Sequence, residues 1–204
     1  MENLSERRTK HPRIVVQSII DKYGSNLVFE FSHYLYKPQT MEDQRKLFIV
    51  DGHFLSNESY VDRMLKDVPE GMELSLNSRV YLPDGMVKQI PMIDLSAPAA
   101  GILGRVIDVL PVHVAESMLW FESGRSHHGY GRHLINHSEW IQLMGRLLLA
   151  NQPKMPPIVD PRWIGHRLIA GYSALRWTRN TDYYIQEPVL SKKAHLIKSD
   201  RSKD

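Results

Sequence analysis

Residues 119–130 read Leu-Trp-Phe-Glu-Ser-Gly-Arg-Ser-His-His-Gly-Tyr, an apolar run that enters a glycine-flanked group of Arg, Ser and His. Residues 115–124 have the pattern of a β-strand, and Gly129-Tyr130-Gly131 predicts a bend. A turn of this kind gathers backbone N–H groups, the Arg125 guanidinium and imidazoles around one spot, which suits the phosphates of a triphosphate or a phosphodiester. The segment therefore predicts an anion site at the end of a strand.

Two further stretches carry a carboxylate after an apolar run. One is 91–96, which ends in Asp94, and the other is 158–160, which ends in Asp160 and is followed sixteen residues later by Arg176. Alone, each has a simpler interpretation: an Asp that closes a strand is most often a turn former, and Asp160 can cap a helix begun by Pro161. Both interpretations stay open at this point.

The surrounding sequence predicts alternating helices and strands. The expected helices are 14–23, ended by Gly24; 59–66; 138–150, with Ser138 as N-cap; and 161–170, ended by Gly171. The expected strands are 27–36, 46–50, 72–82, 86–95, 115–124 and 172–178, with Pro83-Asp84-Gly85 turning the third into the fourth as a hairpin. This order predicts a two-lobed α+β (α/β) fold in one domain, 1–190, followed by a basic, flexible tail, 191–204.

Composition narrows the function classes. With 42% apolar and 24% charged residues in 204, the chain is typical of a globular protein of one domain or one two-lobed unit. A net charge of +3 admits a polyanionic partner without requiring one. The absence of cysteine excludes disulfides, thiolate zinc sites, iron–sulfur clusters and cysteine nucleophiles.

Nothing in the sequence indicates secretion or a membrane. Residues 1–13 are charged and precede no apolar signal segment. The most apolar stretch, 97–115, is interrupted by Arg105, Asp108 and two prolines, so it does not have the pattern of a membrane-spanning helix. We expect a cytoplasmic protein with no membrane partner.

Taken in order, these stretches resemble the motifs of the archaeo-eukaryotic primase superfamily of primase-polymerases. The first motif of that family is an apolar strand with two carboxylates one residue apart, the second is Ser-x-His, and the third is an apolar residue before Asp. Asp94, Ser126 with His128, and Val159-Asp160 are similar to these in order and rough spacing. Leu175-Arg176 also resembles the Arg-bearing strand that follows the third motif, so the resemblance covers about residues 72–190.

The resemblance implies a primase-polymerase-like fold with an RRM-like antiparallel sheet and a small N-terminal α/β lobe. It implies that Asp94 and Asp160 are catalytic and hold Mg²⁺ or Mn²⁺, hard cations that prefer oxygen ligands. Ser126 and His128 would hold nucleotide phosphates, with His128 also catalytic, and Arg176 and Arg125 would add charge-assisted hydrogen bonds. The implied partners are nucleoside triphosphates, single-stranded or primed DNA or RNA, and separately encoded proteins.

The sequence departs from the family at its first motif, where Ser96 stands in place of the second carboxylate. One replacement is conceivable within the predicted hairpin. If facing residues have numbers that sum to about 169, Ser75 lies opposite Asp94 and Glu73 becomes its diagonal neighbour on the same face. Glu73 is therefore a candidate third metal ligand.

Other uses of these residues were weighed. His133 and His137 have zinc-ligand spacing, but the predicted helix start at Ser138 leaves the pair in a loop. Most of the aromatic residues lie on apolar faces that predict a core, and Tyr130 is the better candidate for an exposed ring. Two functions follow: a nucleotidyltransferase that makes or extends nucleic acid, or a catalytically weakened primase-like subunit that binds nucleotide or nucleic acid within a larger complex.

Overall fold

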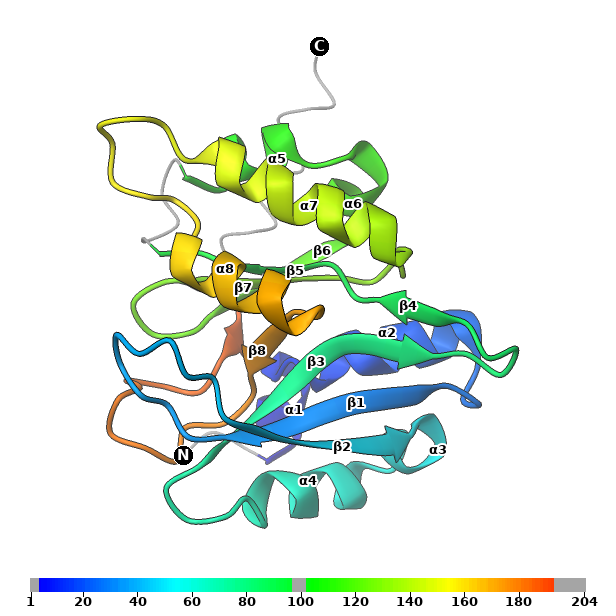
Figure 1. Cartoon of the computed structure of the whole chain (residues 1–204). Coiled ribbons are helices and arrows are strands. Elements are labelled where there is room, and N and C mark those ends of the chain that lie inside the picture. Colours follow the sequence, from blue (N-terminus) through cyan, green and yellow to red (C-terminus); the bar gives the residue numbers. More distant parts are fainter. Residues whose placement is uncertain (1–3, 97–101, 193–204) are drawn as a thin grey trace.

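The computed structural model describes residues 4–96 and 102–192 and shows two antiparallel sheets with helices around them (Figure 1). Its helices are α1 (Leu4–Lys10), α2 (Arg13–Tyr23), α3 (Gly52–Leu55), α4 (Glu58–Lys66), α5 (Ile102–Val109), α6 (Val112–Ser117), α7 (His137–Ala150) and α8 (Pro161–Ala170). Its strands are β1 (Val28–Tyr34), β2 (Arg45–Asp51), β3 (Glu73–Tyr81), β4 (Val87–Gln89), β5 (Met92–Asp94), β6 (Met118–Glu122), β7 (His127–Gly131), β8 (Ala174–Arg176) and β9 (Val189–Leu190). The α+β class predicted from the sequence is confirmed.

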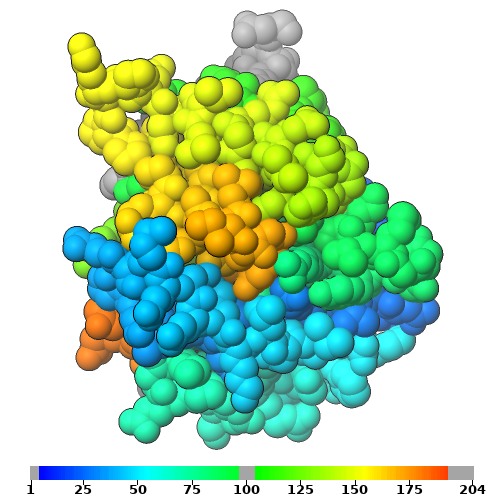
Figure 2. All heavy atoms as spheres, viewed as in Figure 1, coloured from blue at the N-terminus to red at the C-terminus, as the bar shows by residue number. Residues whose placement is uncertain are grey.

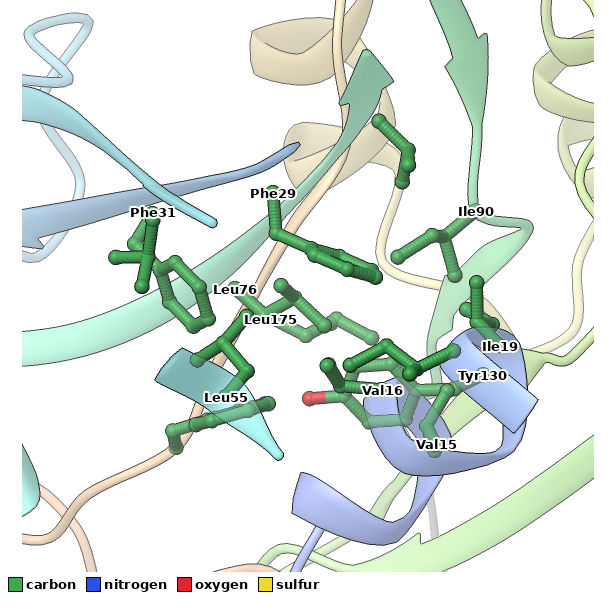
Figure 3. Close-up of a cluster of buried hydrophobic side chains, with 14 of the residues drawn as sticks. Val15, Val16, Ile19, Phe29, Phe31, Leu55, Leu76, Ile90, Tyr130 and Leu175 are labelled. Atoms are coloured by element: carbon green, nitrogen blue, oxygen red, sulfur yellow. The ribbon is translucent and has the colours of Figure 1, made fainter. Parts of the chain in front are cut away.

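The larger sheet has the order β2-β1-β3-β4, and β8 pairs with the first half of β3 while β4 pairs with its second half. One face of this sheet is apolar and packs on α2. Figure 3 shows the resulting cluster, in which Phe29, Phe31 and Leu76 from the sheet meet Val15 and Ile19 from the helix. Burial of such side chains contributes roughly 1.5–3 kcal/mol each to folding, so this core fixes the sheet on which half of the site is built.

The other face of the larger sheet is polar although it is buried. Arg45 donates to Ser75 Oγ at 2.8 Å, and Asn77 Nδ2 donates to Glu30 Oε1 at 3.0 Å. The hydroxyl of Ser32 links these two pairs by donating to Asn77 Oδ1 at 3.0 Å. Buried polar groups are stable only when they are hydrogen-bonded. These bonds therefore stabilise the polar face of the larger sheet, over which α8 and the β1–β2 loop lie.

The smaller sheet, β5-β7-β6-β9, is covered on both faces. Ile93 and Trp120 pack with α5, α6 and α7 in a second core, whereas Met92, Phe121 and Tyr130 reach the core of the larger sheet. The two sheets therefore share apolar contacts. The strands expected in a small N-terminal lobe, β1 and β2, pair with β3 in the larger sheet.

The predicted hairpin over 72–95 is only partly correct. Its second strand divides at Pro91: β4 pairs with β3, and β5 joins the smaller sheet against β7. A proline cannot donate a ladder hydrogen bond, so the strand leaves one sheet at this residue and enters the other. In the part that does pair, facing residues sum to 168, as in Val80 with Lys88.

Three local predictions are also corrected. Residues 115–117, the first three of the strand expected over 115–124, belong instead to the helix α6. Gly129-Tyr130-Gly131 is not a bend but part of β7, where a Cβ on Gly129 would lie 2.6 Å from Trp120 Cζ3. The N-cap of α7 is Asn136 in place of Ser138, and it forms a capping box with Glu139.

The basic tail predicted from Ser191 begins with an ordered residue, since the Ser191 amide donates to the Trp120 carbonyl at 2.8 Å. Residues 193–204 of that tail lie outside the described part of the chain. Within residues 4–96 and 102–192, the helices are all too short or too polar to cross a bilayer.

Candidate functional site

The first pair of site residues is formed by neighbouring strands of the smaller sheet. Asp94, the last residue of β5, faces His128 of β7 in the antiparallel register. Facing side chains on such strands lie on one side of the sheet, and here Asp94 Oδ1 and His128 Nε2 are 3.7 Å apart. The first and second predicted motifs are therefore direct neighbours.

Asp160 is held beside Asp94 through the backbone. The Asp160 amide donates to the Asp94 carbonyl at 3.2 Å, and Leu95 forms an isolated bridge with Val159. Asp160 is also the N-cap of α8, since its Oδ1 accepts hydrogen bonds from the amides of Arg162 at 2.8 Å and Trp163 at 3.3 Å. The capping interpretation is correct, and both bonds use the same carboxylate oxygen.

Arg176 brings a positive charge from the larger sheet. It lies on β8, is 4% exposed, and donates from Nη2 to the Ser123 carbonyl in the β6–β7 loop at 2.8 Å. Its guanidinium carbon is 3.9 Å from the centre of the Tyr184 ring, a cation–π contact. Arg176 Nε has no hydrogen-bond partner among the described residues.

All four of these side chains line one cleft of about 250 Å³ between the sheets. Asp94 and His128 come from the smaller sheet, Asp160 from the start of α8, and Arg176 from the larger sheet. The remaining lining residues come from β1, the β1–β2 loop, β2, β3, α8, β8 and the segment after it; they are Tyr34, Leu35, Tyr36, Lys37, Gln39, Thr40, Glu42, Asp43, Arg45, Ser75, Arg162, Trp163, His166, Arg167, Ala174, Leu175 and Tyr184.

The surroundings of Asp94 and His128 shift the pKa values of these two groups in opposite directions. Burial, together with the negative charge of Asp160, raises the pKa of Asp94 to about 7, although Arg176 and Arg167 act the other way. Burial and the positive charge of Arg176 hold the pKa of His128 well below its ordinary value, so this imidazole is neutral. His128 Nδ1 has no hydrogen-bond partner among the described residues.

Two predicted phosphate ligands lie outside this cleft. Ser126 and Arg125 belong to the β6–β7 turn and are absent from the lining. The Ser126 carbonyl accepts a hydrogen bond from the Ser123 amide at 3.0 Å, which closes the turn, and Arg125 is exposed. Of the Ser-x-His pair, the structure brings only His128 to the cleft.

The register that would place Glu73 beside Asp94 does not form. Ser75 pairs with Arg176 of β8, and Asp94 belongs to the other sheet. The Glu73 carboxylate is fully buried and accepts from the backbone amides of Asn180 and Thr181, at 2.9 and 2.8 Å, and from the hydroxyls of Thr178 and Thr181, at 2.5 and 2.8 Å. Glu73 anchors a turn and does not replace the missing acid.

Ser96 does not replace the missing carboxylate either. Its hydroxyl donates to the Pro157 carbonyl, and its amide donates to the Ile158 carbonyl at 2.8 Å. Ser96 therefore joins the backbone of the first motif to the segment that carries the third. It lies outside the residues that line the cleft.

Two arginines that line the cleft were not predicted from the sequence. Arg45 of β2 and Arg167 of α8 both contact the carboxylate of Asp43, in the β1–β2 loop. Neither arginine lies in a motif, and their proximity depends on how α8 packs over the larger sheet. The one available indication was the spacing of Arg167 from Asp160, two turns along the same predicted helix.

The aromatic and histidine predictions have mixed outcomes. Tyr130, expected to be exposed, is fully buried. Tyr36, which lines the cleft, is 40% exposed, and its ring centre lies 5.4 Å from that of Tyr183, which is 56% exposed. His133 and His137 do not share a helix, because α7 begins at His137. Within the described residues, no group of three or more His, Asp or Glu side chains could hold a metal ion.

The resemblance to the primase motifs implies Mg²⁺ or Mn²⁺ at the cleft, and Asp94 and Asp160 are the side chains that would hold it. Asp94 and Asp160 are two carboxylates, and Asp160 is close enough for its charge to raise the pKa of Asp94. Such a pair fits one Mg²⁺ or Mn²⁺, because these ions retain waters and take further oxygens from substrate phosphates. It does not supply the extra acid from which a two-cation site is ordinarily built.

One of the comparisons with known proteins finds a match. No curated protein and no solved structure matches the chain. A family model described as AEP-like, archaeo-eukaryotic primase 1D-like, matches residues 55–189, a span that contains Asp94, His128, Asp160 and Arg176. Because that span exceeds half of the 204 residues, the chain belongs to the archaeo-eukaryotic primase 1D-like family.

Proposed function

We propose that the cleft binds a nucleoside triphosphate together with one divalent cation and transfers the nucleotide to the 3′-hydroxyl of a nucleic-acid primer, forming a phosphodiester bond and releasing pyrophosphate. The observation that carries this proposal is the convergence of Asp94, His128, Asp160 and Arg176 in one cleft. Two carboxylates and a guanidinium group thus line the same cleft, a combination that suits a polyphosphate bridged by a cation.

Each residue has a role that follows from its position. Asp94 and the free oxygen of Asp160 would hold the cation, which when bound neutralises phosphate charge and favours ionisation of the attacking hydroxyl. Arg176 Nε would donate to a phosphate oxygen, because this atom has no other acceptor among the described residues. His128 is neutral, so Nδ1 or Nε2 can donate one hydrogen bond to the substrate without adding charge.

The test is extension of a labelled primer on a template with all four nucleotides and Mg²⁺ or Mn²⁺. The variant is Asp94→Asn with Asp160→Asn, because Asn keeps the size of both side chains and is as good a helix cap as Asp. We expect extension to fall by at least about 100-fold, as for loss of a metal-assisted step. Glu70→Gln, at an exposed turn, is the matched control and should extend normally.

The second candidate function is binding of nucleotide or nucleic acid without transfer, as a subunit of a larger complex. Ser96 favours it, because its hydroxyl is engaged by the Pro157 carbonyl where the family motif has an acid. Nucleotide binding by the wild-type chain without any extension would support this candidate. Equal extension by the wild-type chain and the double variant would contradict the primary proposal.

A further inference from the structure

The β1–β2 loop, residues 35–44, covers part of the cleft. It contributes Lys37, Thr40 and Asp43 to the lining. The Thr40 carbonyl accepts a hydrogen bond from Arg162 Nη2 of α8 at 2.8 Å. Figure 2 shows this loop in blue against the orange surface of α8. Side chains of α8 thus hold the loop on the cleft.

The second contact of the loop is made by Asp43. Arg45 Nε donates to both of its carboxylate oxygens, at 2.9 and 3.0 Å, and Arg167 Nη2 donates to Oδ2. Burial alone would raise the pKa of Asp43, but the charges of Arg45 and Arg167 outweigh burial and hold it below its ordinary value. Asp43 is therefore an ionised carboxylate between two guanidinium groups.

The guanidinium of Arg167 is buried with more donors than Asp43 can satisfy. Its side chain is 2% exposed, and Nε and Nη1 have no hydrogen-bond partner among the described residues. A buried donor without an acceptor is costly, and buried guanidinium groups are ordinarily matched to two acceptor oxygens. The site is thus under-supplied with acceptors while Asp43 occupies it.

Arg45 is fixed in position for the same anion. Its Nη1 donates to Ser75 Oγ at 2.8 Å and Ser32 Oγ at 3.2 Å, and its guanidinium carbon lies 4.3 Å from the centre of the Tyr34 ring. These contacts come from the sheet and not from the loop. If Asp43 moved away, they would still hold Arg45, and the charge of Arg167 would lose its carboxylate partner.

We propose that Arg45 and Arg167 form a phosphate-binding subsite separate from Arg176, and that Asp43 is its internal occupant, displaced with the β1–β2 loop when a phosphate binds. The inference rests on the proposed function in taking the phosphate to be that of a nucleoside triphosphate. A terminal phosphate carries about two negative charges and three acceptor oxygens, as other phosphate monoesters do, which matches two guanidinium groups better than a singly charged phosphodiester does.

The test compares two loop carboxylates. Asp43→Asn removes the charge that faces the arginines, and Glu42→Gln removes a charge that also lines the cleft but pairs with Lys37 at 2.9 Å. The probe is inorganic tripolyphosphate without metal, measured by titration calorimetry. We expect Asp43→Asn to bind it at least about fivefold more tightly and Glu42→Gln to change binding less than about twofold, because only the first removes the competing anion. Equal changes, or weaker binding by Asp43→Asn, would overturn the subsite.

Arg167→Gln is the complementary variant and should weaken tripolyphosphate binding by about tenfold or more, the loss expected for a buried charge-assisted contact. Its folding is checked by thermal unfolding. Misfolding of Arg167→Gln would not affect the main comparison, because the effect expected of Asp43→Asn is a gain of affinity.

A second titration with a single-stranded oligothymidylate identifies the source of the phosphate. Tighter binding of the oligonucleotide alone by Asp43→Asn would overturn the assignment to a nucleotide. Primer extension is scored separately, so that a chain without extension but with the expected Asp43→Asn gain would contradict the proposed transfer reaction and support the subsite.

Discussion

The amide of Asp160 donates a hydrogen bond to the carbonyl of Asp94 at 3.2 Å, so the backbone holds these two acids next to each other. The neighbouring bridge between Leu95 and Val159 extends this contact by one residue. Because these bonds do not depend on the charges of the two residues, conservative variants of either acid should leave the local backbone intact.

Asp94→Asn is expected to stabilise the chain at high pH. The pKa of Asp94 in the folded chain, about 7, lies above its ordinary value of 3.8, so the folded chain keeps a proton there that the unfolded chain has lost. The free energy of unfolding therefore falls as the pH rises from about 4 to 7, and Asn removes that loss. We expect the Tm at pH 8 to rise by about 2–4 °C, with little change at pH 4. Glu70→Gln is the control, and a lower Tm for Asp94→Asn at pH 8 would contradict the prediction.

Affinity for the divalent cation should depend on pH with the same midpoint. A carboxylate binds a cation only after losing its proton, and Asp94 does so near pH 7. Mn²⁺ affinity at pH 6 should thus be about tenfold weaker than at pH 8. Titration monitored by electron paramagnetic resonance measures this. Affinity that is independent of pH would show that Asp94 is not a ligand.

Glu73→Gln should destabilise the fold without changing cation affinity. The carboxylate accepts four hydrogen bonds in a fully buried position, and an amide cannot accept all of them. The expected loss is about 1–3 kcal/mol in the free energy of unfolding, measured by urea denaturation. Mn²⁺ affinity at pH 8 should stay at the wild-type value, and a large decrease would restore Glu73 as a ligand.

The capping box of α7 gives a matched pair of variants. Asn136→Ala removes the side-chain acceptor of the Glu139 amide and should lower the free energy of unfolding by about 1 kcal/mol. Ser138→Ala changes an exposed residue inside the first turn and should have less effect. Urea denaturation of both variants tests whether the helix begins where the structure places it. A greater loss for Ser138→Ala would favour the cap predicted from the sequence.

Alanine substitutions of two glycines, one in the smaller sheet and one in α7, should have opposite effects on stability. A Cβ at Gly129 would lie 2.6 Å from Met118 Cε and from Trp120 Cζ3, so Gly129→Ala should cost about 1–3 kcal/mol. No atom lies within 4 Å of a Cβ at Gly145 in α7, and Gly145→Ala should stabilise the helix by about 0.5–1 kcal/mol. Thermal unfolding of the two variants should therefore give shifts of opposite sign.

The sequence predicted the parts of the site that depend on short-range order along the chain. Asp94, His128 and Asp160 each follow an apolar run, and strand pairing then brings them together. It did not predict the role of Pro91, where the chain passes from one sheet to the other. The predicted hairpin therefore put Glu73 and Asp94 on one sheet, whereas they belong to different sheets. A hairpin turn fixes register only as far as the two strands remain paired.

The arginines could not be predicted for a related reason. Arg45 and Arg167 are far apart in the sequence and meet only because α8 lies over the polar face of the larger sheet. Isolated arginines in a sequence are most often exposed charges, and nothing in their spacing distinguishes these two. Burial and the shared contact with Asp43 give them their significance.

The bonds of Arg176 determine how the cleft can open. This side chain belongs to the larger sheet, yet it donates to the Ser123 carbonyl in the loop that joins β6 to β7 of the smaller sheet. Separation of the two sheets would break this bond, whereas displacement of the β1–β2 loop breaks mainly side-chain contacts of the loop with α8 and β2. We therefore expect substrate admission to follow loop motions, on nanoseconds to microseconds, and not the slower hinge closure of many two-lobed enzymes.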